Sequence, residues 1–151
     1  MATNRETVRD ALATLLTTDL TGAGNSAQAV YNYKVGDFAG QSPVVIVTSE
    51  GSERKDIVFS SPERYSIFYL SVMVFVLYAD PDVSWTEADA EDRLDLIEKD
   101  ISETLQTNYG HSSGTWHRIF IEGRTQVLEV TIAGDQYLVE IFPVRVEIND
   151  T

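Results

Sequence analysis

The chain has 151 residues and no cysteine, and its 24 acidic and 11 basic residues give a formal net charge of −13. Without cysteine it forms no disulfide, no thiolate metal site and no cysteine nucleophile. The negative charge also disfavours direct binding of nucleic acid, because lysine and arginine contacts to phosphate supply most of the non-specific affinity. The length predicts a single domain, residues 1–151, with a core large enough to fold without disulfides or metals.

The negative charge has three interpretations. It keeps a protein soluble, it repels nucleic acid that slides past the surface, or it adapts the protein to a very salty cytoplasm, where acidic surfaces poor in lysine are common. The chain has only three lysines, Lys34, Lys55 and Lys99. Composition is compatible with each of these interpretations.

The N-terminal segment predicts an amphipathic helix that ends near Thr18. The four residues from Thr3 to Glu6 fit a capping box. Apolar side chains then follow the helical spacing of a single stripe: Val8, Ala11, Leu12, Leu15 and Leu16. Because residues 20–28 are small, polar and glycine-bearing, we expect a flexible connection next. The N-terminus is polar where a signal peptide is apolar, so we expect a protein made in the cytoplasm.

Two short apolar runs, residues 30–33 and 43–48, predict strands. Residues 49–62 are polar and crowded with alternating charge, apart from one apolar triplet. We expect them to form a long protruding loop or mobile hairpin between two antiparallel strands. Loops of this length in compact domains are usually functional or disordered, so this segment is a candidate for contact with a partner.

Residues 65–80 predict a long central strand. Residues 65–79 carry no charge, no glycine and no proline, and they are rich in β-branched and aromatic side chains. In an extended chain both faces of this strand are apolar. Because each buried apolar side chain contributes roughly 1.5–3 kcal/mol, neither face can be left in water. We therefore expect helices on one face and more of the chain, or another subunit, on the other.

A second helix is predicted from a capping box at residues 84–87 to about Leu105. One stripe is apolar: Ala90, Leu94, Ile97, Ile101 and Leu105. The other side is acidic: Glu87, Asp89, Glu91, Asp92, Asp95, Glu98, Asp100 and Glu103. The helix dipole favours acidic residues only in the first turn, and here the excess continues along the helix. The acidic side is therefore either a solvated face or a surface that meets or repels a partner.

The C-terminal third predicts three strands after a loop at residues 108–114. They are expected at residues 116–122, 126–132 and 136–148, the last two joined by a short hairpin turn at 133–135. Pro143 implies an edge position or a bulge in the last strand. Two helices and about six strands, mostly joined by hairpins, predict an α+β fold with a mostly antiparallel sheet.

Candidate catalytic and metal-binding groups are few. The two histidines, His111 and His117, have the spacing of neither a helical ligand pair nor a common zinc signature. Ser112 and Ser113 lie beside glycine and outside any nucleophile elbow, so a turn explains them. One stretch imitates a calcium loop through Asp80, Asp82, Ser84, Thr86 and Glu91. It has tryptophan where such a loop needs glycine, so a turn and a helix cap explain it better.

The elements follow one another in a definite order. They are the N-terminal helix with its stripe at 8–16, the segment 36–45 (GDFAGQSPVV), the charged loop 49–62, the central strand, the acidic helix with Leu94, Ile97, Ile101 and Leu105, and the closing hairpin from 134–137. Over most of the chain this order and spacing resemble the tail terminator proteins of long-tailed phages and tailed archaeal viruses.

The resemblance implies an α+β sheet flanked by helices and assembly into a homo-hexameric ring. In that family the ring caps the finished tail tube, stops polymerisation of the tube protein and offers a docking surface for the head–tail connector. It implies a virion protein of the neck region, made in the host cytoplasm, that DNA passes only as cargo. It implies no enzymatic activity, no cofactor, no metal and no membrane contact.

On this resemblance we expect two functional surfaces. The first is the loop 49–62, expected to contact the tail tube through Glu50, Glu53, Arg54, Lys55 and Asp56. The second is the acidic face of the long helix, expected to line the lumen with Asp92, Asp95, Glu98 and Glu103. Like charge there lets DNA pass without adhering.

Two alternatives stay open at this point. One is another neck protein, such as a head-completion or connector component, which is expected to copurify with heads and not with tails. The other is a small enzyme or ligand-binding domain. That alternative requires a pocket that contains His117, Arg118 and carboxylates with shifted pKa values.

Overall fold

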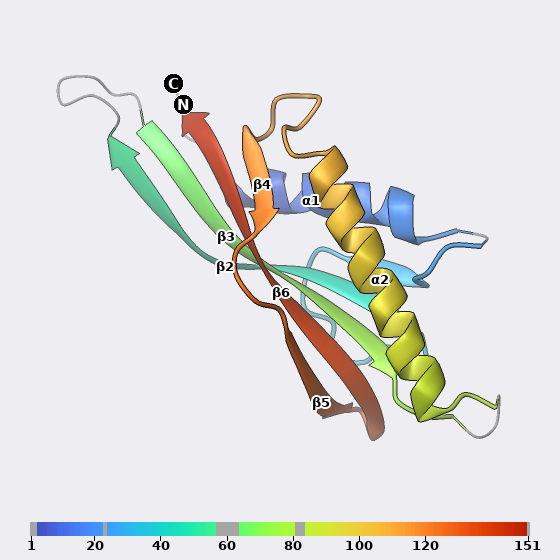
Figure 1. Cartoon of the computed structure of the whole chain (residues 1–151). Helices are drawn as coiled ribbons and strands as arrows, with labels where there is room; N and C mark the ends of the chain where they lie inside the picture. Colours follow the sequence, from blue (N-terminus) through green and yellow to red (C-terminus); the bar gives the residue numbers. More distant parts are fainter. Residues whose placement is uncertain (1–2, 23, 57–63, 81–83, 151) are drawn as a thin grey trace.

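The computed structural model describes residues 3–22, 24–56, 64–80 and 84–150, and shows an α+β fold in which two helices cover one face of a six-stranded sheet (Figure 1). In chain order the elements are α1 (Arg5–Leu20), β1 (Ala29–Tyr31), β2 (Val44–Asp56), β3 (Arg64–Leu77), α2 (Glu87–Thr107), β4 (Arg118–Ile121), β5 (Gln126–Ile132) and β6 (Asp135–Asp150). The predicted fold class is confirmed.

The sheet is organised around β3, which lies between β2 and β6. The strand order is β1-β2-β3-β6-β4, and β5 pairs with β6 along the same edge as β4. Only β1 runs parallel to its neighbour; the other pairs are antiparallel. The prediction of a central strand at residues 65–80 is confirmed, although the strand ends at Leu77 and Asp80 forms only an isolated bridge with Trp85.

The main core lies between the helices and one face of the sheet. Every second side chain of β3 enters it, namely Phe68, Leu70, Val72, Val74 and Val76. The apolar stripes predicted for both helices pack against this face. The caps differ from those expected: Asn4 caps α1, and the capping box of α2 joins Thr86 to Asp89. The cap of α1 therefore lies one residue later, and the cap of α2 two residues later, than the predicted capping boxes imply. Helix α1 ends at Leu20.

A smaller second core covers part of the opposite face of the sheet. The ring of Phe38 packs edge-on against Phe75 and Tyr137, with centroid distances of 4.9 and 5.3 Å. Met73 and Ile141 are only half-buried at the margin of this cluster. More of the chain thus covers the C-terminal half of β3 on this side. We call the sheet face opposite the helices the open face.

Of the two forms expected for residues 49–62, a loop or a hairpin, the structure shows a paired hairpin for the first part. Residues up to Asp56 continue β2 and pair with β3, with a register shift between Ser49 and Gly51. This part of the hairpin carries polar side chains on both faces, so its sequence lacks the apolar alternation that marks a half-buried strand. Residues 57–62 lie outside the described residues.

The position of Pro143 also corrects a prediction. It lies within β6, a strand with neighbours on both edges, and the register with β3 runs past it without a shift. The Pro143 carbonyl accepts a hydrogen bond of 2.8 Å from the Glu122 N–H, where β4 has ended and β5 has not begun. The N and C=O of a residue in an antiparallel strand point to the same edge. The missing N–H therefore faces this interruption, not the ladder with β3.

We predict that Ile97→Ala lowers the free energy of unfolding by about 2–5 kcal/mol, because Ile97 lies on the side of α2 that faces the core and is fully buried. The neighbouring residue of the same helix, Leu96, is 43% exposed. Leu96→Ala removes the same number of carbons and is expected to cost less than about 1 kcal/mol. Urea unfolding of both variants measures the difference, and equal losses would contradict the packing described here.

Candidate subunit interface

The open face carries a shallow apolar pocket of about 360 Å³ between the middle of β3 and the middle of β6. It begins where the cover by Phe38 ends, because Met73 and Ile141 border both the second core and the pocket. Its lining comprises Glu50, Tyr69, Leu70, Ser71, Met73, Glu122, Ile141, Pro143 and Val144. Apolar atoms dominate this lining, and the two carboxylates stand at its margin. We call this site the open-face pocket.

A network of charged side chains lies beside the open-face pocket. The carboxylate of Glu147 is 4% exposed and accepts a hydrogen bond of 2.6 Å from the Tyr65 hydroxyl. The guanidinium groups of Arg118 and Arg145 lie 3.5 and 3.9 Å from the same carboxylate. Arg145 also pairs with Glu122 at 3.2 Å, which links the network to the pocket margin. The Tyr65 hydroxyl is thus the close partner of the buried Glu147 carboxylate, and the two arginines compensate its charge from a longer distance.

Tyr65 is the residue of this network whose pKa is strongly shifted. Burial raises the pKa of Tyr65 to about 12, and the hydrogen bond to the Glu147 carboxylate adds to the shift. Tyr65 therefore stays protonated and keeps donating its hydrogen bond well above neutral pH. Arg118 is held on its other side by aromatic rings, since its guanidinium lies 4.4 Å from the ring centroid of Phe120.

The five residues predicted to contact the tail tube do not form one surface. Glu53 and Lys55 lie on the open face, where the Tyr69 hydroxyl donates to Glu53 at 2.8 Å and lowers the pKa of that carboxyl. Arg54 lies on the other face, over the ring of Phe68. Glu50 belongs to the pocket margin. The side chain of Asp56 lies outside the described ones, and tube contact stays a prediction.

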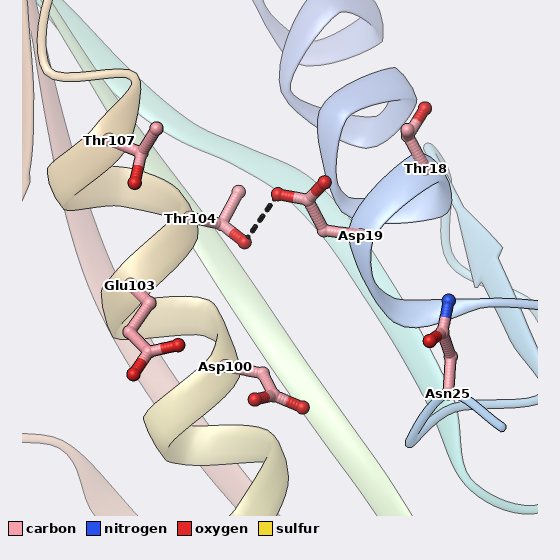
Figure 2. A pocket seen from close by; sticks show the side chains of 7 residues that line it. All are labelled: Thr18, Asp19, Asn25, Asp100, Glu103, Thr104 and Thr107. Atoms are coloured by element: carbon pink, nitrogen blue, oxygen red, sulfur yellow. Dashed lines mark hydrogen bonds between the residues drawn. The ribbon is translucent and has the colours of Figure 1, made fainter.

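Of the four acidic residues predicted for the lumen, three lie on α2 away from its apolar stripe, and Glu98 borders that stripe. Asp92, Asp95 and Glu103 are exposed and Glu98 is half-buried. The acidic surface continues into a groove of about 500 Å³ between α1 and α2 (Figure 2). There the hydroxyl of Thr104 donates to the Asp19 carboxylate at 2.8 Å. The helix layer therefore presents an acidic outer surface, and its place in a lumen stays a prediction.

The residues weighed for catalysis or metal binding have structural contacts. The ring of His111 lies 4.4 Å from that of Trp116, and the backbone N–H of His117 donates to the Glu147 carbonyl. Arg118 belongs to the network, but neither it nor His117 lines the open-face pocket. Asp82, from the calcium-like stretch, lies outside the described residues. In the described ranges no cluster of three histidine, aspartate or glutamate side chains has a metal-binding arrangement.

A search against models of known protein families finds no match, and no curated protein matches the chain. In the part of the chain that the structure describes, neither helix combines the length and apolarity needed to cross a membrane. The fold, the open-face pocket and the distribution of charge are thus the features from which function is inferred.

We predict that Tyr65→Phe destabilises the protein at pH 8 by about 1–3 kcal/mol, because the buried Glu147 carboxylate loses a donor. The raised pKa of Tyr65 stabilises the fold fully below pH 10, its value in the unfolded chain, and that contribution is lost as pH rises towards 12. The difference between wild type and variant should therefore shrink over this range.

The matched control for this experiment is Tyr33→Phe. Tyr33 is 58% exposed, so removal of its hydroxyl is expected to change stability at pH 8 by no more than about 0.5 kcal/mol. Chemical unfolding at a series of pH values measures both variants. A loss for Tyr65→Phe that stayed constant from pH 8 to pH 12 would contradict the role given to its hydroxyl.

Proposed function

We propose that the protein is a structural component of a virus tail, which forms a ring on the tail tube, ends tube growth and joins the tail to the head connector. The observation that carries this proposal is the open face. The central strand is packed under helices on one side, and its other side is left partly open over an apolar pocket. A partly uncovered apolar hollow beside charged side chains is a place where another protein surface can dock.

The fold agrees with what the resemblance implies for a ring subunit. It is an α+β sheet flanked by helices, and it offers two different outer surfaces, an acidic one over the helices and the open face with its apolar pocket. Surfaces that differ in this way suit head-to-tail contacts, and head-to-tail contacts close into rings when the rotation allows. The proposed copy number of six comes from the resemblance.

The acidic outer surface of α2 is proposed to face the channel. Asp92, Asp95, Glu98 and Glu103 repel the phosphate backbone, so DNA would pass through the ring without adhering. The net charge of −13 agrees with a channel that does not retain DNA. A structure of the ring with a neutral or basic bore would contradict the assignment.

Loss of the protein from virions tests the proposed function directly. Without a terminator, polymerisation of the tube protein has no stop, so we expect particles with tails of uncontrolled length and free heads. Electron microscopy of lysates that lack the protein measures tail length. Tails of normal length beside incomplete heads would instead support a head-completion protein.

Salt is predicted to promote assembly of the purified protein. Each copy carries a charge of −13, so copies repel one another at low ionic strength. At about 1 M salt the Debye length falls to about 3 Å and this repulsion is screened, while apolar contacts persist. Native mass measurement and negative-stain microscopy at low and high salt should show a ring at high salt.

The open-face pocket is predicted to be needed for this assembly. Met73→Lys places a charge in an apolar contact and should weaken association at least tenfold, with the circular dichroism of the monomer unchanged. Ser112→Lys adds the same charge in an exposed loop and is the matched control. Equal association of the two variants would show that the pocket lies outside the subunit contact.

A further inference from the structure

We infer that the outer edge of β5 pairs with an extended segment of another protein, and that this segment carries basic side chains at alternate positions. The segment adds a strand to the sheet and turns its basic side chains to the side covered by α2. This inference goes beyond the proposed ring and does not depend on it.

The strand β5 is the longest of the three strands that pair on one side only. In the described ranges it pairs with β6 and with no other strand (Figure 1). The strand β1 has three residues, and at β4 the Ile119 N–H already donates to the Tyr109 carbonyl at 3.0 Å. The seven residues of β5 include no proline and no lysine, and its register has no shift. Proteins use such devices to protect an edge from pairing, and β5 has only the charge of Glu129.

The outer edge of β5 presents backbone groups from every second residue. A two-residue turn, 133–134, has positive φ at both positions, so the flanking pair Ile132 and Asp135 is hydrogen-bonded. Bonded pairs alternate along an antiparallel ladder, and the even-numbered residues of β5 therefore bond to β6. The odd-numbered residues point their N–H and C=O groups outwards, and in the described part of the chain these groups have no backbone partner. They are Val127, Glu129 and Thr131.

Carboxylates line this edge on the helix side of the sheet. Glu129 lies there because it pairs with Leu138, a residue of the main core. Glu140 of β6 lies on the same side and is 5% exposed. The helix α2 adds a row at helical spacing, Glu87, Glu91, Asp95 and Glu98. Among the described residues, no lysine or arginine forms an ion pair with any of these six carboxylates.

The carboxylates of the helix and of the sheet edge are close enough to repel one another. The Glu129 carboxylate raises the pKa of Tyr78, and the first two glutamates of the α2 row add to the shift. Burial raises the pKa of Glu140, and the last two residues of the row raise it further. Basic side chains placed between α2 and β5 relieve this repulsion, so charge selects a basic occupant.

The other side of the edge is apolar. Leu128 is 38% exposed on the open face, beside the half-buried side chains of Val130 and Ile132. Side chains alternate along an extended segment, so basic and apolar residues in turn fit the two sides. This chain has no such segment, because no two of its 11 basic residues stand two positions apart. The occupant is therefore another protein and not a second copy.

A pair of synthetic peptides with the same composition tests the pairing. The peptide KVKVKVK alternates lysine with valine, whereas KKKKVVV carries the same charge without alternation. Fluorescence anisotropy at low salt measures the binding of each labelled peptide to the whole protein. We expect KVKVKVK to bind about tenfold more tightly or better. Equal binding would show attraction to an acidic protein alone and would overturn the inference.

Hydrogen exchange of the backbone locates the bound peptide. KVKVKVK should slow exchange of the outward amides of Val127, Glu129 and Thr131 about tenfold or more, because these amides gain partners. The even-numbered amides of β5 already bond to β6 and should change little. Slowing that is absent, or equal at odd and even positions, would overturn the inference.

Two neighbouring residues of α2 provide a matched pair of charge reversals. Glu91 belongs to the row beside β5, whereas Asp92 is exposed on the outer side of the helix. Glu91→Lys is expected to weaken binding of KVKVKVK about tenfold or more, and Asp92→Lys less than about threefold. Circular dichroism checks that both variants fold. Equal losses would contradict the position given to the basic side chains.

The backbone contact has its own variant. Val127→Pro removes one outward N–H and leaves the ladder with β6 intact, so binding of KVKVKVK should fall about tenfold or more. Val127→Ala keeps that N–H and should bind within about threefold of the wild type. Equal binding by the two variants would contradict strand addition.

The outcomes separate this inference from the proposed function. Ring formation is measured without peptide, so a ring that does not bind KVKVKVK overturns the inference alone. Binding with the expected exchange pattern by a protein that forms no ring at any salt concentration supports the inference and contradicts the ring. Slowing of the odd-numbered amides by increasing concentration of the protein itself would identify a second copy as the occupant and overturn the inference.

Discussion

The pairing of β3 with β6 is the constraint on which the rest of the structure depends. The register runs without interruption from Arg64 opposite Asp150 to Leu77 opposite Tyr137. Both strands carry apolar side chains on both faces, so the pair is stable only when each face is covered. The helices cover one face, and the segment around Phe38 covers part of the other. The open-face pocket lies in the part that this segment leaves uncovered.

The two outer faces of the sheet layer differ in the kind of charge they carry. The apolar remainder lies on the open face, beside a network in which Glu147 joins Tyr65, Arg118 and Arg145. The acidic residues of α2 lie over the opposite side of the sheet. Copies that approach through their helix layers repel one another, whereas carboxylates on the open face are paired with arginine or lysine side chains. This arrangement limits self-association to a small set of orientations and agrees with the proposed ring.

Sequence periodicity predicted the long elements and missed the features that depend on pairing. The stripes from Val8 to Leu16 and from Ala90 to Leu105 repeat often enough to define a helix face. The sequence left open whether the distal part of β2 forms a loop or a hairpin, because a polar strand has no apolar alternation. The network around Glu147 joins separate strands, so no local pattern shows it; the one available signal was Arg145 and Glu147 two residues apart, on one face of the last strand.

The alternation of side chains along β3 and β6 determines two surfaces at once, the side that packs in the core and the side that forms the open face. Odd-numbered Met73 faces the proposed docking site, while its neighbours Val72 and Val74 fill the interior. Inserting or deleting one residue in either strand would exchange these sets, turning the binding patch inward and the interior outward. Length variation among natural variants is thus expected to be excluded from both strands and concentrated in connections such as the one between α1 and β1. The contact surface that these two strands form is therefore expected to change among natural variants by substitution alone.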